Sequence, residues 1–375
     1  MITIKKVESK KEMKRFVKFP LKLYKTTPYY VPLFNCDEKQ IMNPKKNHAA
    51  VGCEIECFLA YKDDQVVGRI AGIIVHKSNE VHDEKCIRFS RFDFIDDLEV
   101  ASQLLNAVKN MGIRHGLKEI HGPWGFNDTD REGMLTFGFD RISTFATNYN
   151  FEYYPKIMQQ LGFNKESEWV ELEFDFKNIN SKYTDIAKFA EQKNNLIDIA
   201  GTMSVKKIVK KYGGKFFDCY NETYKNLDNF IEITGEAKRN VLSLFATALN
   251  RKFISVIVDK ETDKVIGFGI AMPSLGNIIK KHNGSAFLSA IGLLRTIAKP
   301  KELELVIIGV SPEYRKSGIA AVTISHIWQN IIKYNIQTVV SNPMLTTNSS
   351  VLNLWKFIPN KIIKRRQTFR ANIDE

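Results

Sequence analysis

The chain has 375 residues, 44% of them hydrophobic and 11% aromatic, which is enough for two or three globular domains. No apolar run approaches the ~18 residues of a membrane span, and the N-terminal MITIKKVESKKEMKRF lacks the apolar segment of a secretory signal. The five cysteines, an odd number without the spacing of a disulfide framework, indicate a reducing, cytoplasmic location.

The charge is unevenly distributed along the chain. Residues 1–176 contain 25 Lys and Arg against 26 Asp and Glu, whereas residues 177–375 contain 30 against 16, so the net charge of +13 comes from the second half. A basic field attracts anions such as coenzyme A, nucleic acid or acidic lipid surfaces, although a solvated basic face is the alternative. No nucleic-acid-binding motif is present, so nucleic acid is not expected as a partner, and tRNA is the one exception left open.

The first half alternates strand and helix patterns. Ser9, with Glu12 three residues later, has the form of a capping box and predicts a helix to about Tyr24. Asp63 and Asp64 separate two apolar segments and predict a hairpin turn. The other expected elements are strands at 2–7, 57–61, 66–76, 87–95, 117–121 and 168–176, and helices from Asp96 or Asp97 to about 115 and at 153–162.

Residues 122–154 show no regular period and are rich in Gly, Asp, Asn and aromatic residues. A loop of this length inside a compact domain is usually functional or mobile. Hydrogen-bonding groups interleaved with aromatic rings suit recognition of a polar small molecule, and a loop that merely packs is the alternative. The candidate substrate-binding residues are Trp124, Asn127, Asp128 and Tyr149, together with Asp130, Arg131, Asn148 and Asn150.

The second half follows a polar linker predicted at residues 177–183. Gly213 and Gly214 predict a break in the helix that Ser204 caps, and residues 276–299 are expected to be irregular or helical, with an apolar patch at 286–294. The other expected elements are a helix and a strand within 184–200, helices near 215–226, 236–249 and 349–357, and strands at 253–258, 265–272, 303–310, 338–342 and 362–371.

Two local similarities indicate an internal duplication. The sequence VGRIA at 67–71 is similar to IGFGI at 266–270, an offset of 199 residues, and each follows a charged hairpin turn. The sequence LGFNK at 161–165 corresponds to FIPNK at 357–361, an offset of 196. Because the two offsets nearly agree, we predict two similar α/β units in tandem.

The stretch ELELVIIGVSPEYRKSGIAAVTISHIW, at residues 302–328, carries the most specific signal. A buried strand, a turn at Ser311–Tyr314 and a helical pattern follow one another, with Arg315 and Lys316 at the joint. A helix N-terminus offers unpaired N–H groups and the positive end of a dipole, and Gly318 lets an anion approach the backbone. The spacing predicts a pyrophosphate cradle, and a purely structural strand–helix joint is the alternative.

The run VSPEYRKSGIAA within this stretch resembles the acetyl-CoA motif of the GNAT acyltransferase superfamily, V-x-P-x-Y-R-x-x-G-I-G/A. The resemblance implies an α/β (α+β) fold of two tandem GNAT-like units, each with a mixed, mostly antiparallel sheet flanked by helices. It implies a degenerate unit at 1–176, a unit with the acyl-CoA motif at 184–375, and acetyl-CoA or another acyl-CoA as cofactor. The cofactor-binding residues that it implies are Ile308, Gly309, Val310, Arg315, Lys316, Ser317, Gly318, Ile319, Ala320 and Asn348.

The corresponding joint of the first half has the sequence DFIDDLE, at residues 93–99. Its carboxylates would cap the following helix themselves and would repel a pyrophosphate. We therefore expect one coenzyme A site per chain, and we expect the first unit to shape the acceptor site or to act as a scaffold.

Acyl transfer to an amine requires a base for the ammonium proton and an acid for the leaving thiolate. Glu304 lies six residues before Val310, the spacing at which histone-type GNAT members carry their base, and a solvent-facing edge carboxylate is the alternative. Where the family carries a tyrosine as the acid, this chain has Trp355, whose indole is only a neutral N–H donor. Tyr314 or water is the candidate substitute, and Trp355 would then be a core residue.

The sequence thus predicts an N-acyltransferase of the EC 2.3.1 type that moves an acyl group from acyl-CoA to a small-molecule or peptide amine. Two alternatives stay open: a non-catalytic acyl-CoA-binding or scaffold protein, and a tRNA-dependent aminoacyl transferase of the tandem-GNAT type. No metal site is expected, because Cys53-x3-Cys57 and His76-x5-His82-x3-Cys86 lack a second ligand pair.

Overall fold

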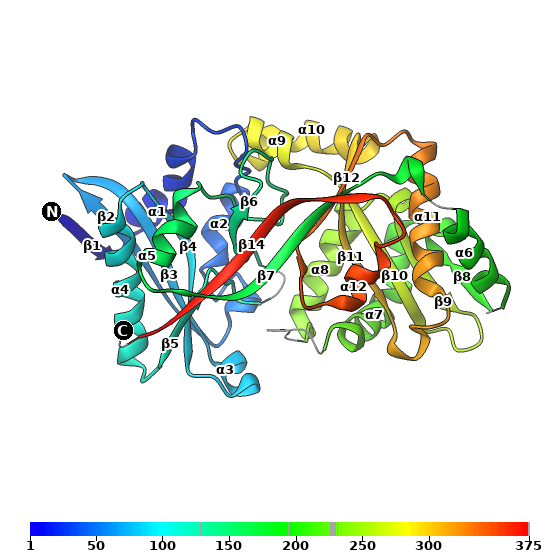
Figure 1. The fold of residues 1–375 in the computed structure, drawn as a ribbon, viewed down its shortest axis with the longest axis horizontal. Helices are drawn as coiled ribbons and strands as arrows, with labels where there is room; N and C mark the ends of the chain where they lie inside the picture. Colours follow the sequence, from blue (N-terminus) through cyan, green and yellow to red (C-terminus); the bar gives the residue numbers. More distant parts are fainter. Residues whose placement is uncertain (128–129, 180, 194, 226–229, 231, 374–375) are drawn as a thin grey trace. The chain divides into compact units, whose positions relative to one another are not determined.

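The structure is a computed structural model that describes all residues except 128–129, 180, 194, 226–229, 231 and 374–375 (Figure 1). The chain divides into two compact units. The first comprises residues 1–170, 276–290 and 364–375, and the second comprises 171–275 and 291–363. Each unit is a mostly antiparallel sheet flanked by helices, which confirms the predicted α/β (α+β) class. Within the described ranges, no helix combines the length and the apolar character needed to cross a membrane.

The sheet of the first unit has the strand order β1-β2-β3-β4-β5-β14, with β6 paired to β14. Strands β4 and β5 pair in parallel, whereas β3 pairs with β4 antiparallel. Helix α4 packs on β3, and its Leu104 and Val108 are fully buried in a core that also holds Phe89 of β4. The elements of this unit are β1 (Ile2–Lys6), α1 (Lys10–Leu23), α2 (Asn35–Ile41), β2 (Cys53–Lys62), β3 (Gln65–Val75), α3 (His76–His82), β4 (Cys86–Phe94), α4 (Leu98–Arg114), β5 (Glu119–Gly122), β6 (Met134–Phe137), α5 (Tyr153–Gln160) and α9 (Gly276–Lys281).

The sheet of the second unit has the strand order β7-β12-β11-β10-β9-β8, in which β11 and β12 are parallel. One core cluster joins its strands to α6 and α11, and another joins them to α7 and α8. Successive residues of β9, such as Val256 and Ile257, belong to different clusters because they point to opposite faces of the sheet. Helices therefore cover both faces of this sheet. The elements are α6 (Ser181–Lys193), β8 (Leu196–Asp198), α7 (Val205–Tyr224), α8 (Gly235–Ala248), β9 (Ile254–Asp259), β10 (Val265–Pro273), β11 (Glu302–Val310), α11 (Ile319–Lys333), β12 (Thr338–Ser341), β13 (Met344–Leu345) and α12 (Ser349–Leu354).

Two long strands and one helix pass from one compact unit into the other: β7 (Asn164–Phe174), β14 (Asn360–Asn372) and α10 (Ala286–Ala298). The end of β7 pairs with β12 of the second unit, through Glu173 and Phe174. The end of β14 pairs with β5 of the first unit, from Phe369 opposite Gly122 to Asn372 opposite Glu119. Each unit thus takes a strand from the other half of the chain. The predicted division into 1–176 and 184–375 did not include this exchange.

Most local signals of the sequence are present in the structure. The capping box of Ser9 and Glu12 forms at the start of α1, and Asp97 caps α4 with its carboxylate. The predicted break at Gly213 and Gly214 is wrong, because α7 continues through both residues. A Cβ at Gly213 would lie 2.9 Å from Leu242, so this glycine lets α8 approach α7.

The glycines of the two repeated sequences have equivalent roles. A Cβ at Gly68 of β3 would lie 2.7 Å from Leu104 of α4, and a Cβ at Gly267 of β10 would lie 2.5 Å from Ile319 of α11. In each unit, therefore, the strand that precedes the central strand carries a glycine, and the helix that follows the central strand packs against this glycine. The similarity at an offset of 199 residues reflects the same close packing of strand and helix.

Candidate functional site

The predicted cradle follows β11, a central strand of the second unit. Strand β11 pairs with β12 from Glu302 to Leu305, and the backbone N–H of Asn342 donates to the Leu305 carbonyl over 2.9 Å. On the other side, the register against β10 shifts between Ile270 and Ala271. The described pairing with β12 covers only the first part of β11, so the part that leads to the cradle has no strand partner from β12.

The loop between β11 and α11 has the geometry of an anion site. Gly318 is the N-cap of the 15-residue helix α11 with a φ of 82°, a left-handed conformation that favours glycine. A Cβ there would also lie 2.8 Å from Cβ of Ala190 on α6. Arg315 and Lys316 are exposed, and neither forms an ion pair with any residue that the structure describes. Two cations and a free helix N-terminus are therefore open to an anion.

Several of the predicted cofactor-binding residues also have structural roles. The carbonyl of Ile308 accepts a hydrogen bond from the Tyr224 hydroxyl over 2.9 Å. A Cβ at Gly309 would lie 2.4 Å from the ring of Phe268, so packing alone requires this glycine. The side chain of Asn348 caps α12 by accepting from its backbone. The remaining members of the set are the buried Val310 and Ile319, the half-buried Ala320, and Ser317, whose hydroxyl donates to the Tyr314 carbonyl over 2.6 Å.

The two predicted catalytic residues lie near opposite ends of β11. Glu304 is only 4% exposed and accepts a hydrogen bond from the Ser274 hydroxyl over 2.8 Å. The alternative of a solvent-facing edge carboxylate is therefore wrong. Tyr314 donates to Asp259 over 3.0 Å, and this bond raises the pKa of the tyrosine. Val310 lies six steps along β11 from Glu304, about 20 Å at ~3.3 Å per residue, so the structure does not bring Glu304 and Tyr314 together.

Trp355, which stands where the resemblance expects a tyrosine, is a core residue. It is 4% exposed, its ring lies 4.8 Å from that of Phe174, and its N–H is 3.2 Å from the sulfur of Met344. An indole in this position anchors α12 to β7 and offers no titratable proton.

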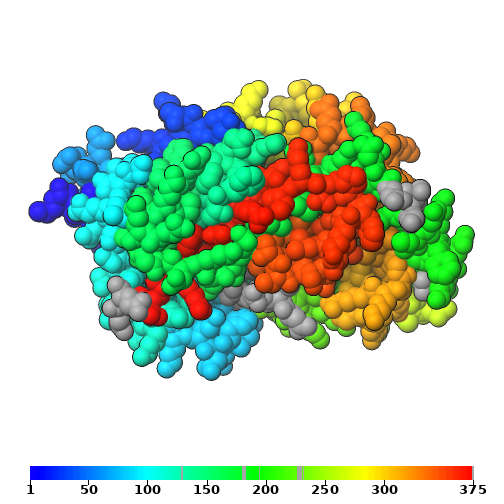
Figure 2. All heavy atoms as spheres, viewed as in Figure 1, coloured from blue at the N-terminus to red at the C-terminus, as the bar shows by residue number. Residues whose placement is uncertain are grey.

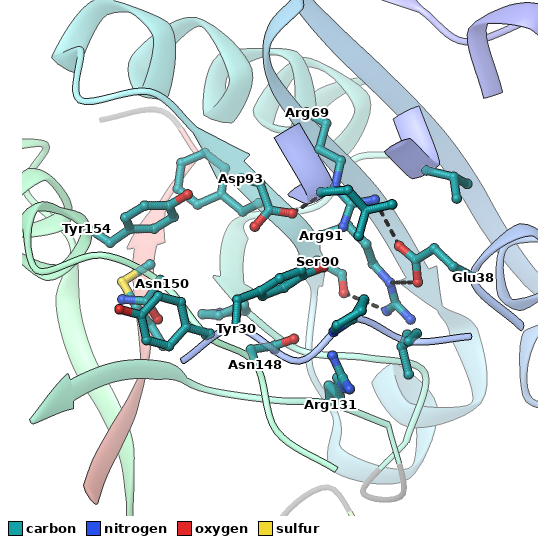
Figure 3. Close-up of a pocket in the computed structure, with 18 of the residues that line it drawn as sticks. Tyr30, Glu38, Arg69, Ser90, Arg91, Asp93, Arg131, Asn148, Asn150 and Tyr154 are labelled. Atoms are coloured by element: carbon teal, nitrogen blue, oxygen red, sulfur yellow. Dashed lines mark hydrogen bonds and ion pairs between the residues drawn. The ribbon is translucent and has the colours of Figure 1, made fainter. Parts of the chain in front are cut away.

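The first unit contains a pocket that the sequence predicted only in part (Figure 3). Its cavity volume is about 60 Å³. Its wall is made of polar, charged and apolar residues, and Val17, Leu21 and Phe92 are among the apolar ones. The polar and charged members are Tyr30, Asn35, Glu38, Arg69, Ser90, Arg91, Asp93, Arg131, Asn148, Tyr149, Asn150 and Tyr154.

Arg69 connects two carboxylates at the pocket. Its Nε donates to Asp93 over 2.7 Å, and its Nη1 donates to Glu38 over 2.8 Å. Asp93 also accepts from the hydroxyl of Tyr24, which lies 2.9 Å from that of Tyr154. Burial acts to lower the pKa of Arg69, but the two carboxylates outweigh it and raise that pKa, so the guanidinium stays charged.

Arg91 forms a second buried ion pair at a bulge of β4. Its backbone φ is 48°, and its guanidinium donates to both oxygens of Asp130 over 3.0 and 3.2 Å. Burial acts to raise the pKa of Glu38, but Arg69 and Arg91 outweigh it and hold the pKa below its ordinary value. Glu38 is thus a carboxylate although it is buried.

The predicted loop contributes to this pocket with some of its residues. Arg131, Asn148, Tyr149 and Asn150 line the cavity. The N–H of Trp124 instead donates to Glu166 over 3.1 Å. The backbone carbonyl of Asn127 accepts from Asp130, which pairs with Arg91, and Asp128 lies outside the described residues.

Sequence reasoning missed Tyr30, Glu38, Arg69 and Arg91, which come from a loop, α2, β3 and β4. A signal existed, because Arg69 interrupts the apolar run of β3 and Arg91 breaks the alternation of apolar residues in β4. A buried arginine needs a partner, yet nothing in the sequence identifies Glu38 as that partner.

At the first strand–helix joint Asp97 caps the helix as predicted, whereas Asp93 pairs with Arg69. The Asp97 side chain accepts from the N–H groups of Glu99 and Val100 over 3.0 and 3.3 Å. The N-terminus of α4 is therefore already occupied by a negative charge.

One group of possible metal ligands occurs within the described ranges: Glu84, Cys86 and His121, whose ligand atoms lie within 4.8 Å of one another. Both ring nitrogens of His121 already contact carboxylates, at 2.8 Å from Glu166 and 3.1 Å from Glu119. Burial, with Glu84, raises the pKa of Cys86 to about 12, so the thiol is protonated at neutral pH. This group is better explained as a hydrogen-bond network than as a metal site.

Solved structures share this architecture along the whole chain. A tandem GNAT protein from the clavulanic acid biosynthesis pathway, solved without AcCoA, matches with a TM-score of 0.56 and 8% identity over 100% of this chain and 99% of that one. The chain has the tandem GNAT fold. A GCN5-related N-acetyltransferase from Sphaerobacter thermophilus matches with a TM-score of 0.52 and 7% identity over 99% of this chain and 96% of that one. The resemblance seen in the sequence is thus confirmed at the level of the fold.

Similarity in sequence is partial. Protein YghO of Escherichia coli is 28% identical over 160 residues, which cover 42% of this chain and 40% of YghO. A bacterial ceramide synthase of Caulobacter vibrioides is 24% identical over 164 residues, 43% of this chain and 42% of that protein. Each match therefore spans about two fifths of the relative, and no protein-family model matches the chain.

Proposed function

We propose that this protein is an acyl-CoA-dependent N-acyltransferase whose second unit binds the pyrophosphate of coenzyme A. The observation that carries the proposal is the loop before α11, where Gly318 has a left-handed backbone and Arg315 and Lys316 are unpaired. A pyrophosphate matches this arrangement, because it is multiply charged and accepts hydrogen bonds from backbone N–H groups. The tandem GNAT fold supports the assignment.

The reaction joins the acceptor nitrogen to the acyl carbon and breaks the thioester C–S bond, and the amine proton goes to a base. Glu304 is our candidate base, because it is buried and aligned by Ser274. The released thiolate would take a proton from water, because the N–H of Trp355 does not titrate and the hydroxyl of Tyr314 already donates to Asp259.

The name of one partial relative favours an amine acceptor. A ceramide is the amide of a long-chain amino alcohol, so a ceramide synthase forms the same kind of bond that we propose here. The match covers 43% of this chain, and we therefore propose only the amine class and leave the acceptor itself to experiment.

The test is calorimetry with acetyl-CoA and with a long-chain acyl-CoA, followed by detection of free thiol with a panel of amines. We expect one site per chain, and binding should fall at least tenfold in Arg315→Gln, because a charge-assisted hydrogen bond is worth ~1.5–3 kcal/mol. Lys333→Gln, at the other end of α11, is the matched control and should bind as wild type does. Gly318→Asp should abolish binding, but Ala190 makes this variant prone to misfold.

The same experiment separates the alternatives. Binding of coenzyme A without thiol release in the presence of any amine favours a non-catalytic acyl-CoA-binding or scaffold protein. The presence of Trp355 where the family carries a tyrosine supports this alternative. Absence of coenzyme A binding in a folded protein contradicts our proposal and favours a tRNA-borne donor, which the basic second half would suit.

A further inference from the structure

The pocket of the first unit has a buried acceptor without a donor. Glu38 is 8% exposed, and its Oε2 accepts no hydrogen bond from any residue that the structure describes. The ion-pair contact of this oxygen, with Nε of Arg91, is 3.9 Å long, whereas Oε1 lies 2.8 Å from Arg69. A buried carboxylate oxygen normally has a donor within 3 Å, so this one is open to a donor from a ligand.

The pocket also has a buried cation without a counter-ion. Arg131 is 8% exposed and donates only to carbonyl oxygens, those of Phe145 and Val31. No carboxylate among the described residues forms an ion pair with it. Burial lowers its pKa to about 10, which still leaves it charged at neutral pH. The guanidinium has five N–H groups, and its three hydrogen bonds to these carbonyl oxygens leave donors for an anion.

Two neutral polar groups at the same wall are also unused. Within the described ranges, the Tyr30 hydroxyl and the Asn148 side-chain amide take part in no hydrogen bond. Figure 3 shows Tyr30 in the middle of the pocket, with Asn148 and Arg131 on one side of it and Asp93 on the other. A ligand in the cavity would therefore meet donors near Arg131 and an acceptor at Glu38.

Charge balance selects the kind of ligand. Three guanidiniums of the wall lie beside Glu38 and Asp93 of the wall and Asp130, the partner of Arg91, so the formal charges of these six side chains sum to zero. A ligand with a net charge would place an unbalanced charge in a buried site, which is costly. A zwitterion keeps the balance and still satisfies both the open acceptor and the open cation.

The cavity volume limits the size of that ligand. About 60 Å³ is roughly four to six times the ~10–15 Å³ that one water requires. The cavity therefore admits a small molecule, and glycine, with five non-hydrogen atoms, is the smallest amino acid. We propose that the first unit binds a small α-amino acid, with its ammonium group on Oε2 of Glu38 and its carboxylate facing Arg131, Tyr30 and Asn148.

The test measures equilibrium binding without any acyl-CoA, so it does not depend on the proposed acyl transfer. Calorimetry would compare glycine, L-alanine and L-serine with ethanolamine, which lacks the anion, and acetate, which lacks the cation. We expect the amino acids to bind at least tenfold more tightly than either single-charge probe. Tyr30→Phe should weaken binding about fivefold to tenfold, because it removes a hydroxyl that has no partner in the protein.

The matched control is Tyr29→Phe, a neighbouring tyrosine outside the pocket wall, which should bind as wild type does. Glu38→Gln should weaken the amino acids while leaving acetate unchanged, provided that circular dichroism shows a folded protein. Absence of binding at 50 mM of each amino acid overturns the proposal. Acetate binding as tightly as glycine would also overturn it, since the site would then recognise an anion alone.

A separate observation concerns helix α10, whose outer face is apolar. Phe287 is 89% exposed, Leu288 60%, Ile291 68% and Leu294 69%, at helical positions that share one face. Ser289, between them, is fully buried. The atoms of this segment reach the molecular surface (yellow in Figure 2). Apolar side chains this exposed on one helix mark an interaction surface.

The charge around this helix indicates what covers it. Residues 276–301 contain no Asp or Glu, and their five cations are Lys280, Lys281, Arg295, Lys299 and Lys301. At 13 residues, α10 is about 20 Å long by ~1.5 Å per residue, too short to span ~30 Å of hydrocarbon. An apolar helix face with exposed cations near it in the sequence, here Lys281, Arg295, Lys299 and Lys301, is typical of helices that lie in an anionic lipid surface. We infer that α10 docks this protein onto membranes that contain anionic lipids.

Sedimentation with vesicles tests this surface. Wild-type protein should bind vesicles of 70% phosphatidylcholine and 30% phosphatidylglycerol, and the binding should weaken as salt rises. The double variant Phe287→Asn/Ile291→Asn should bind at least tenfold less. Phe189→Asn, which changes a 64% exposed phenylalanine on α6, is the matched control and should bind as wild type does.

Two outcomes would contradict the membrane assignment. One is equal binding of wild type and the double variant to the anionic vesicles. The other is a wild-type dimer that the double variant loses, without vesicle binding by either protein, since the apolar face would then be a contact between two copies of the chain.

Discussion

The exchange of final strands predicts that a residue near the end of the chain stabilises the first unit. Phe369 is 2% exposed, lies in the core cluster that contains Phe89 and Leu104, and is opposite Gly122 on β5. Removing a buried phenylalanine ring costs ~3–5 kcal/mol. At about 1.4 kcal/mol per factor of ten, Phe369→Ala should raise the opening equilibrium of the first unit by about 10² to 4 × 10³-fold.

Hydrogen exchange measured by mass spectrometry resolves this effect along the chain. Peptides from α4 and β5 should exchange much faster in Phe369→Ala than in wild type, because they belong to the unit that loses the ring. Phe357→Ala is the matched control, since Phe357 is 64% exposed and its loss should change exchange little. The reasoning fails if α4 and β5 are as protected in Phe369→Ala as in wild type, or if faster exchange is confined to α11 and β12.

Three further expectations follow from the second unit. Gly267→Ala should destabilise it by ~1–3 kcal/mol in urea unfolding, because the new Cβ would lie 2.5 Å from Ile319; no loss would refute the close packing. Trp355→Ala should cost ~3–5 kcal/mol, and an unchanged midpoint would contradict its core role. Burial acts to lower the pKa of His326, but Asp198, 2.5 Å from Nδ1, and Glu191 outweigh it and raise that pKa. His326 therefore stabilises the fold below the unfolded pKa of ~6.5, and this stability is lost as the pH rises through the folded pKa; melting temperatures from pH 5.5 to 8.5 should show the loss in wild type but not in His326→Gln.

Local sequence signals determined much of this protein. The box of Ser9 and Glu12, the carboxylate of Asp97 and the positive φ at Gly318 each act within a few residues of chain, and they are present in the structure. The repeated glycines at an offset of 199 also follow from the sequence, because each one is needed by the helix that packs on its strand. Such signals are readable because their cause and their effect lie close together along the chain.

Other features depend on contacts between distant segments. Gly213 was expected to end a helix, yet α7 continues, because Leu242 packs where a side chain would be. A solvent-facing edge carboxylate was the alternative expectation for Glu304, yet β11 has strands on both sides. The propensity or alternation pattern of a segment does not predict which strand or helix will lie beside that segment.

The pocket of the first unit and the exchange of final strands were decided by tertiary structure alone. Glu38, Arg69 and Arg91 are ordinary charged residues in the sequence, and they become a buried network only when the fold brings Glu38 of α2 to Arg69 of β3 and Arg91 of β4. Strand β14, from the second half of the chain, pairs with β5 of the first half, with Phe369 opposite Gly122 and Asn372 opposite Glu119. Pairing between residues more than 200 positions apart leaves no local pattern, and this is the physical reason why the sequence alone could not predict it.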